Sequence, residues 1–298
     1  MEHNFVPTLA TYTLQTRRLL HDATGQYFGT TQDPNELTDY INAARNRLVR
    51  DTGCYRVLQI APITSGQEAY SFNTGGVTGV QVLTSNNLFA TVPNVVFTPQ
   101  AGDIGTGAAG TAIMSGKAPN LTLVSVQMTN SGANYTLPPT VSFTGAGTAT
   151  GTAGVIAFGT FDILNVTLQW GNVRAGLDYA PFTRFNRDIR GLMQYTQRPT
   201  TWSKYGQNTV YLGPVPDQMY VVEFDTVMLP PPLVNQTDVD AILPQYTDPI
   251  PFYAAFLAKY KEADMEEAAR FKEEYRLQAL QAIGSSFTRT IPSQYAAG

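Results

Sequence analysis

Side chains that commonly perform acid–base or nucleophilic chemistry are scarce in this sequence. It contains two histidines, His3 and His21, and one cysteine, Cys54. Two histidines are too few for a His-based metal site, and His21 is predicted to be a solvated surface residue. Cys54 follows a predicted helix end, with Arg50 and Arg56 as its basic neighbours, so we expect a small buried thiol rather than a nucleophile. The sequence therefore predicts no catalytic residue and no metal site.

Two patterns that can indicate ligand or enzyme chemistry have simpler interpretations. Gly105-Thr-Gly107-Ala-Ala-Gly110 matches the literal dinucleotide-binding pattern, but no helix of useful length and no suitably spaced acidic residue follow it. The carboxylate pairs Glu266-Glu267 and Glu273-Glu274 could suggest glycosidase chemistry. They lie beside Arg270 and Arg276, which is typical of a solvated helix face. We therefore expect no cofactor and no enzymatic activity.

The composition indicates a globular chain made in a reducing compartment. At 298 residues two packing units are expected, and 43% of the residues are hydrophobic, which is enough for a sizeable core. A net charge of -4 argues against wrapping DNA, because phosphate neutralisation needs many clustered lysines and arginines. A single cysteine allows no intrachain disulfide, and the first residues do not read as a secretory signal. No apolar run is long enough to span a membrane, so we expect cytoplasmic synthesis and no membrane partner.

A helix is predicted over Asp33–Asp51. Asp33-Pro34-Asn35-Glu36 provides a helix start, and Gly53 provides the end. The side chains at helical spacing from Leu37 to Leu48 are expected to pack on a core, whereas Arg45 is expected on the opposite, solvated face. A weaker helix around Thr13–His21 could pair with this one.

The last third of the chain is also predicted to be helical. One helix is expected over Ile250–Glu262, and a second, with Asp264 as its cap, is expected to run to about Ile283. We predict that these helices pack with Asp33–Asp51. The residues expected in the core of the body are Leu37, Tyr40, Ile41, Leu48, Trp202, Phe252 and Phe256.

Short strands separate the two helical regions. Val57–Ile60, Ala69–Phe72, Phe161–Trp170 and a hairpin over residues 208–225 alternate apolar and polar residues, and a helix is predicted over Phe182–Tyr195. The expected fold class is α+β, with residues 1–74 and 160–298 forming a helical body that carries a small antiparallel β-sheet domain.

Residues 75–159 are predicted to be an inserted β-module. Gly, Thr, Ala, Asn and Val dominate this segment, and Asp103 and Lys117 are its only charged residues. One phrase occurs twice, as Val92-Pro-Asn-Val-Val-Phe-Thr98 and as Leu137-Pro-Pro-Thr-Val-Ser-Phe-Thr144, and the two copies align with a small gap. Alternating Thr and Val broken by Gly and Pro predicts a small β-sandwich-like module.

The C-terminal tail, residues 284–298, is expected to dock on a partner. Gly284-Ser-Ser286 ends the last helix, and the segment beyond is more apolar and aromatic than an ordinary solvated terminus. The residues expected to make the contact are Phe287, Arg289, Ile291, Pro292 and Tyr295. The alternative is that this segment folds back on the chain's own helices.

Several phrases of the sequence resemble the head-to-tail adaptor, or connector, proteins of short-tailed bacteriophages. The first is the helix Glu36–Arg45, with its Tyr-Ile-Asn and Ala-Arg. The more specific phrases are Trp202-Ser-Lys-Tyr-Gly206, Val210-Tyr-Leu212, Pro214-Val-Pro-Asp217, Tyr220, Pro231-Pro-Leu233 and Asp248-Pro-Ile250. The resemblance covers the predicted body and leaves residues 75–159 unmatched.

The resemblance implies a structural virion protein in the neck or tail region. About twelve copies would form a ring beneath the portal protein and above the tail tube or nozzle protein, and genomic DNA would pass through the lumen without specific binding. The predicted tail would then dock on the portal or on a neighbouring subunit. The alternative is a carbohydrate- or receptor-binding tail protein, in which Phe89, Tyr135 and Phe143 of the repeat would present a sugar platform.

Overall fold

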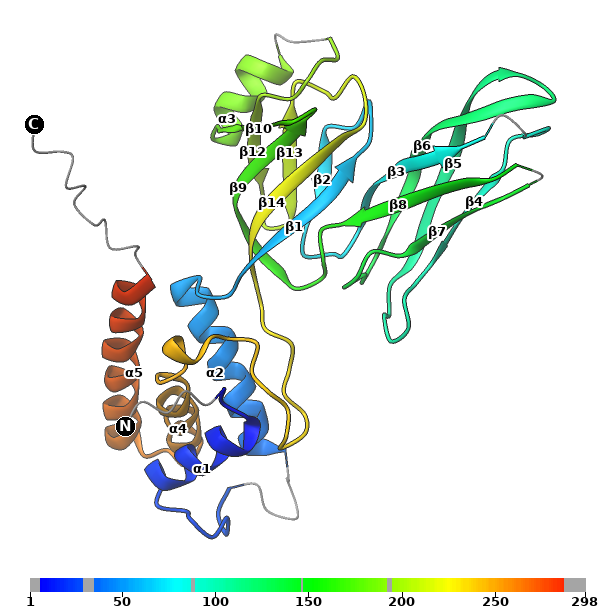
Figure 1. The fold of residues 1–298 in the computed structure, drawn as a ribbon. Coiled ribbons are helices and arrows are strands. Elements are labelled where there is room, and N and C mark those ends of the chain that lie inside the picture. The colour runs from blue at the N-terminus through cyan, green and yellow to red at the C-terminus, as the bar shows by residue number, and fades with distance from the viewer. Residues whose placement is uncertain (1–5, 29–34, 87–88, 146, 192–194, 287–298) are drawn as a thin grey trace, which may run out of the picture. The chain divides into compact units, whose positions relative to one another are not determined.

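The computed structural model describes residues 6–28, 35–86, 89–145, 147–191 and 195–286 (Figure 1). The chain divides into two compact units. Met1–Arg56 and Leu229–Gly298 form a helical unit, and Val57–Met228 form a β unit.

The helical unit is built around one central helix. α4 (Ile250–Lys261) packs against α1 (Leu9–Leu19), α2 (Glu36–Thr52) and α5 (Met265–Ser286). A short helical turn, η2 (Pro244–Tyr246), precedes α4. Ala254, Ala255 and Ala258 are buried on α4, and these small side chains allow three helices to approach it closely. The predicted association of the first long helix with the C-terminal helices is therefore present.

Local signals explain where these helices begin and end. The Thr8 side chain accepts a hydrogen bond from the Thr11 amide, so α1 begins before the predicted Thr13. α2 ends at Gly53, which has a left-handed φ of 63°. Glycine adopts this conformation without steric strain because it has no Cβ. The Asp264 carboxylate accepts a hydrogen bond from the Glu267 amide and caps α5 as predicted.

The predicted core residues of the helical unit differ in how deeply they are buried. Leu37, Ile41 and Leu48 are buried in the interior. Tyr40 is half-buried, and its hydroxyl donates to the Glu36 carboxylate. Phe252 and Phe256 are also half-buried on α4, and the Phe256 ring lies beneath the ammonium group of Lys272.

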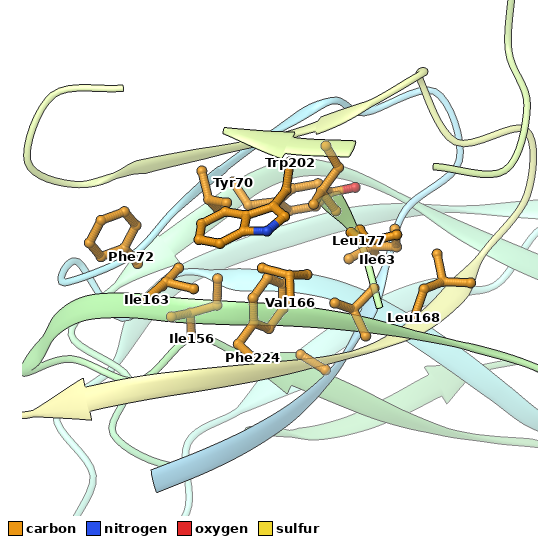
Figure 2. Packing of buried hydrophobic residues seen from close by; sticks show 14 of the residues in the cluster. Ile63, Tyr70, Phe72, Ile156, Ile163, Val166, Leu168, Leu177, Trp202 and Phe224 are labelled. Atoms are coloured by element: carbon orange, nitrogen blue, oxygen red, sulfur yellow. The ribbon is translucent and has the colours of Figure 1, made fainter. Parts of the chain in front are cut away.

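Two four-stranded sheets face each other in the β unit. One sheet has the order β1-β14-β9-β10 and the other has the order β11-β12-β13-β2. Their strands are β1 (Arg56–Ile63), β2 (Ala69–Ser71), β9 (Thr160–Trp170), β10 (Val173–Gly176), β11 (Asp178–Tyr179), β12 (Thr201–Tyr205), β13 (Thr209–Gly213) and β14 (Tyr220–Met228). The inward side chains of both sheets share one core, in which Trp202, Val166 and Phe224 are buried (Figure 2).

The third sheet has six strands in the order β3-β8-β7-β4-β5-β6. Its strands are β3 (Val77–Ser85), β4 (Asn94–Thr98), β5 (Thr106–Lys117), β6 (Asn120–Ala133), β7 (Thr140–Thr144) and β8 (Ala149–Val155). The sheet curls until its first and last strands, β3 and β6, pack against each other, which makes a nearly closed barrel.

The predicted fold class, a helical body with a small sheet domain, is wrong. Of the residues that the structure describes, 38% lie in strands and 27% in helices, so the described part of the protein is mostly β. The expected short strands outside residues 75–159 form two complete sheets with their own core, because β9 and β14 lie side by side although they are far apart in sequence. The helix predicted over Phe182–Tyr195 is only α3 (Phe182–Phe185) followed by a π-helical turn over Asn186–Arg190.

The repeated phrase corresponds to an internal two-fold relation in the six-stranded sheet. β4 pairs antiparallel with β7, with Val96 opposite Ser142 at the centre and Val95 opposite Phe143. Residues 75–98 align with residues 121–144 without a gap, so that Val80-Gln81 corresponds to Val126-Gln127. Val80 of β3 pairs with Ala153 of β8, and Val126 of β6 pairs with Ala112 of β5. The first strand of each repeat therefore pairs with the last strand of the other repeat.

Each repeat also receives an aromatic ring from the other. Phe89 and Tyr135 are equivalent in the alignment, and they are 0% and 1% exposed. The Phe89 ring lies against Gly147 and the Tyr135 ring lies against Gly105, so a Cβ added at either glycine would overlap a ring. The Phe89 amide donates to the Leu121 carbonyl, and the Tyr135 amide donates to the equivalent Gly75 carbonyl. Glycine is required at both sites because a ring occupies the space of a side chain.

Whether residues 75–159 can be removed without unfolding the rest of the chain remains a prediction. Val77 pairs with Val155 across the first and last strands of this segment, so the deletion can end beside these two residues. Register partners of an antiparallel ladder lie about 5 Å apart, so a short Gly/Ser linker can replace residues 76–154. We expect the shortened chain to unfold in a cooperative transition and to keep its far-ultraviolet helical signal.

The matched control for this deletion also removes Ile156 and Ala157. Ile156 is 0% exposed in the core of the two four-stranded sheets, and the Ala157 amide donates to the Gln59 side chain over 2.7 Å. The control should therefore unfold at a lower temperature than the first variant. Aggregation of both variants would show that the six-stranded sheet is not separable.

Candidate functional site

The groups considered for catalysis occupy ordinary structural positions. His21 is exposed, and Cys54 is half-buried. Burial raises the pKa of the Cys54 thiol, which lowers the thiolate fraction that a nucleophile would need. Among the residues that the structure describes, no cluster of His, Cys, Asp and Glu could hold a metal ion.

The remaining sequence patterns also have structural roles. Gly105–Gly110 leads into and continues along strand β5 rather than opening a helix, so it forms no helix N-terminus for a pyrophosphate. Glu266 pairs with Arg270, and Glu273 pairs with Arg276, on the exposed face of α5. None of the helices in the described part of the chain is long and apolar enough to cross a membrane.

A buried polar network joins distant segments of the helical unit. The Arg45 guanidinium, 1% exposed, donates to both oxygens of the Asp240 carboxylate over 2.6 and 3.1 Å. Arg45 also donates to the Pro231 carbonyl and to the Asn42 side chain. The Tyr12 hydroxyl donates to Asp240 over 2.6 Å. The network therefore fixes α1, α2 and the segment before α4 to one another.

Tyr12 remains a hydrogen-bond donor throughout the physiological range. Burial and then the neighbouring Asp240 carboxylate raise the pKa of the Tyr12 phenol well above its usual value.

The prediction that Arg45 lies on the solvated face of its helix is wrong, because Arg45 is buried. Its spacing of four residues from Ile41 and three from Leu48 places it on the buried face, and that spacing was the signal available in the sequence.

The β unit carries an aromatic surface formed by Phe182, Tyr205 and Tyr211. The Phe182 ring lies 4.4 Å from the Tyr205 ring and 5.2 Å from the Tyr211 ring, measured between centroids. Tyr179 lies on the opposite face of the sheet β11-β12-β13-β2, where it pairs with Trp202 across the strands and packs edge-on against its ring. Because Tyr205 is 54% exposed, the aromatic surface offers aromatic area to a partner.

The aromatic residues proposed for a sugar platform do not form one. Phe89 and Tyr135 are buried between the two repeats, and Phe143 is partly buried against the same interior. They fill the interior of the curled sheet, so the observation that favoured carbohydrate binding is removed.

The predicted docking residues of the tail lie outside the described residues. Phe287, Arg289, Ile291, Pro292 and Tyr295 all follow Ser286, the last residue of α5. Their role in docking remains a prediction.

Comparison with known families gives one match. The model of the SU10 adaptor protein family matches residues 108–296, well over half of the chain. In a comparison with curated proteins, none matches. The family match begins inside the segment that the resemblance left unmatched, and it does not include the helix Glu36–Arg45. The sequence phrases from Trp202 to Ile250 all lie within residues 108–296, and the family match confirms the resemblance drawn from them. The chain therefore belongs to the SU10 adaptor protein family and is a structural, virion-associated head-to-tail adaptor of a tailed bacteriophage.

Proposed function

We propose that the chain assembles into a ring of about twelve copies that joins the portal of the phage head to the tail. The observation that carries this proposal is the family match over residues 108–296. The ring would lie in the neck, with the portal protein on one side and the tail tube or nozzle protein on the other. Genomic DNA would pass through its lumen, and the net charge of -4 favours passage without retention.

The aromatic surface of the β unit supports a subunit interface in this ring. Aromatic residues are enriched at protein interfaces and supply many of their hot spots. Tyr205 is half-exposed, so its loss should affect association more than folding. We expect Tyr205→Ser to weaken subunit association at least about tenfold, equivalent to about 1.4 kcal/mol, with only a small drop in melting temperature from the lost contact with Phe182. Mass photometry over a concentration series measures this, and Tyr27→Ser, at a site 74% exposed in the helical unit, is the matched control.

The ring itself is tested by imaging the purified chain alone and with portal protein from the same phage. The expected particle is a ring with a central channel, stacked coaxially on the portal. A chain that stays monomeric at high concentration and also with portal present would refute the proposal.

Deleting residues 286–298 should leave the fold intact and abolish portal binding, whereas unchanged binding would reject a docking role for the tail.

A further inference from the structure

The helical unit contains a groove of about 710 Å³ beside the end of α5. α1 contributes Leu19, the start of α4 contributes Pro249 and Phe252, and α5 contributes Gln278 and Gln281. All of these residues belong to one compact unit, so the groove is complete within a single chain.

The lining of the groove suits an extended peptide. Leu19, Pro249 and Phe252 provide apolar surface, and glutamine amides stand on several sides. An amide both donates and accepts hydrogen bonds, as the backbone of an extended segment does.

One groove residue has an unsatisfied hydrogen-bonding group. The Gln278 Nε2 donates to the Glu274 carboxylate over 3.0 Å, but its Oε1 is buried and accepts no hydrogen bond from the described residues. A buried acceptor without a donor is costly, and a peptide N–H in the groove would satisfy it if the Gln278 amide turned toward the groove.

We propose that residues 287–298 of the same chain occupy this groove in the free protein. α5 ends at Ser286, one helical turn beyond the groove residue Ala282, which is a rise of about 6 Å. If the first residues after Ser286 reverse the chain, the rest can extend along the groove for about 25 Å. A short tether of this kind gives a millimolar effective concentration, so the chain's own tail outcompetes the tail of a second copy at micromolar concentration.

The segment matches the groove in polarity and charge. Phe287, Ile291 and Tyr295 recur every four residues, and uncharged Thr, Ser and Gln residues separate them. Arg289 is the only charged side chain in the segment. The groove lining carries the exposed carboxylate of Asp248 and the exposed guanidinium of Arg18, and the proposal places Arg289 beside Asp248. Apolar anchors, amide partners and a pairing of Arg289 with Asp248 therefore meet in the groove.

Disulfide trapping in the full chain tests the proposal. Starting from Cys54→Ser, one variant carries Gln281→Cys with Ile291→Cys, and its control carries Leu280→Cys with Ile291→Cys. Leu280 is 52% exposed on the same turn of α5 but does not line the groove. In a glutathione redox buffer, we expect the intramolecular disulfide to form at least about tenfold more in the first variant, because docking raises the local thiol concentration. Mass spectrometry of the unreduced chains measures it.

Each other outcome overturns the proposal. Equal trapping in both variants would mean that the segment does not occupy the groove, and a covalent dimer specific to Gln281→Cys would assign the groove to a second copy. As a second readout, Asp248→Lys should raise hydrogen exchange over residues 287–298, and adding Arg289→Glu should restore protection. An Asp248→Lys variant with unchanged exchange over residues 287–298 would also overturn the proposal. Both measurements concern the free chain and do not depend on ring formation.

Discussion

Replacing Asp240 with alanine is expected to lower the free energy of unfolding by about 3 to 5 kcal/mol, because it leaves the Arg45 guanidinium buried without its counterion. Arg45 is 1% exposed, so water cannot replace the lost carboxylate without opening the helical unit. Urea denaturation followed by far-ultraviolet circular dichroism measures the loss. Glu266→Ala breaks the exposed pair with Arg270 and is the control, for which we expect little change.

A double replacement distinguishes the contribution of the Arg45–Asp240 ion pair from the cost of leaving the Arg45 charge buried alone. Arg45→Met with Asp240→Leu removes both charges and should cost less than Asp240→Ala alone, since a buried pair can often be exchanged for apolar residues at little cost. Tyr12→Phe, which loses one hydrogen bond to Asp240, should cost about 1 kcal/mol. Strictly additive losses across these variants would show that the three side chains do not act as one network.

Replacing Phe89 or Tyr135 with alanine is expected to destabilise the six-stranded sheet by about 3 to 5 kcal/mol, and by similar amounts for the two residues. Each ring is fully buried and fills a space left by a glycine of the opposite repeat. Gly105→Ala and Gly147→Ala should each cost about 1 to 3 kcal/mol through overpacking. The loss is measured by hydrogen exchange in β3–β8 and by denaturant unfolding.

The exchange of rings between repeats predicts a crossed pattern of rescue. Phe89→Ala should relieve the strain of Gly147→Ala but not that of Gly105→Ala, and Tyr135→Ala should relieve only Gly105→Ala. Rescue within a repeat instead of across repeats would contradict the two-fold arrangement.

Local features of the fold could be predicted from the sequence, and long-range pairing could not. The ends of the helices at Gly53 and Asp264 were correct because capping depends on neighbouring residues. The presence of strands over Phe161–Trp170 and Tyr220–Asp225 was also correct, but their pairing into a full sheet was not predicted. Pairing depends on tertiary packing, which short-range periodicity does not encode.

The candidate site shows the same division. The repeated phrase in residues 75–159 was visible in the sequence, yet its buried rings were also open to interpretation as a sugar platform. Arg45 was misplaced because its charge was given more weight than its spacing. Its partner Asp240 lies beyond the whole β unit, so no local pattern could have joined the two residues.

The division of the chain also sets an order for folding during synthesis. The β unit, Val57–Met228, is continuous in sequence and can fold as soon as it leaves the ribosome. α2 emerges earlier, but its buried arginine must wait for Asp240, and its apolar face must wait for α4. A nascent chain therefore carries a finished β unit and an unfinished helical unit until α4 and α5 have been translated. The surface of the helical unit therefore forms after the β unit, which delays any assembly through it until α4 and α5 have been made.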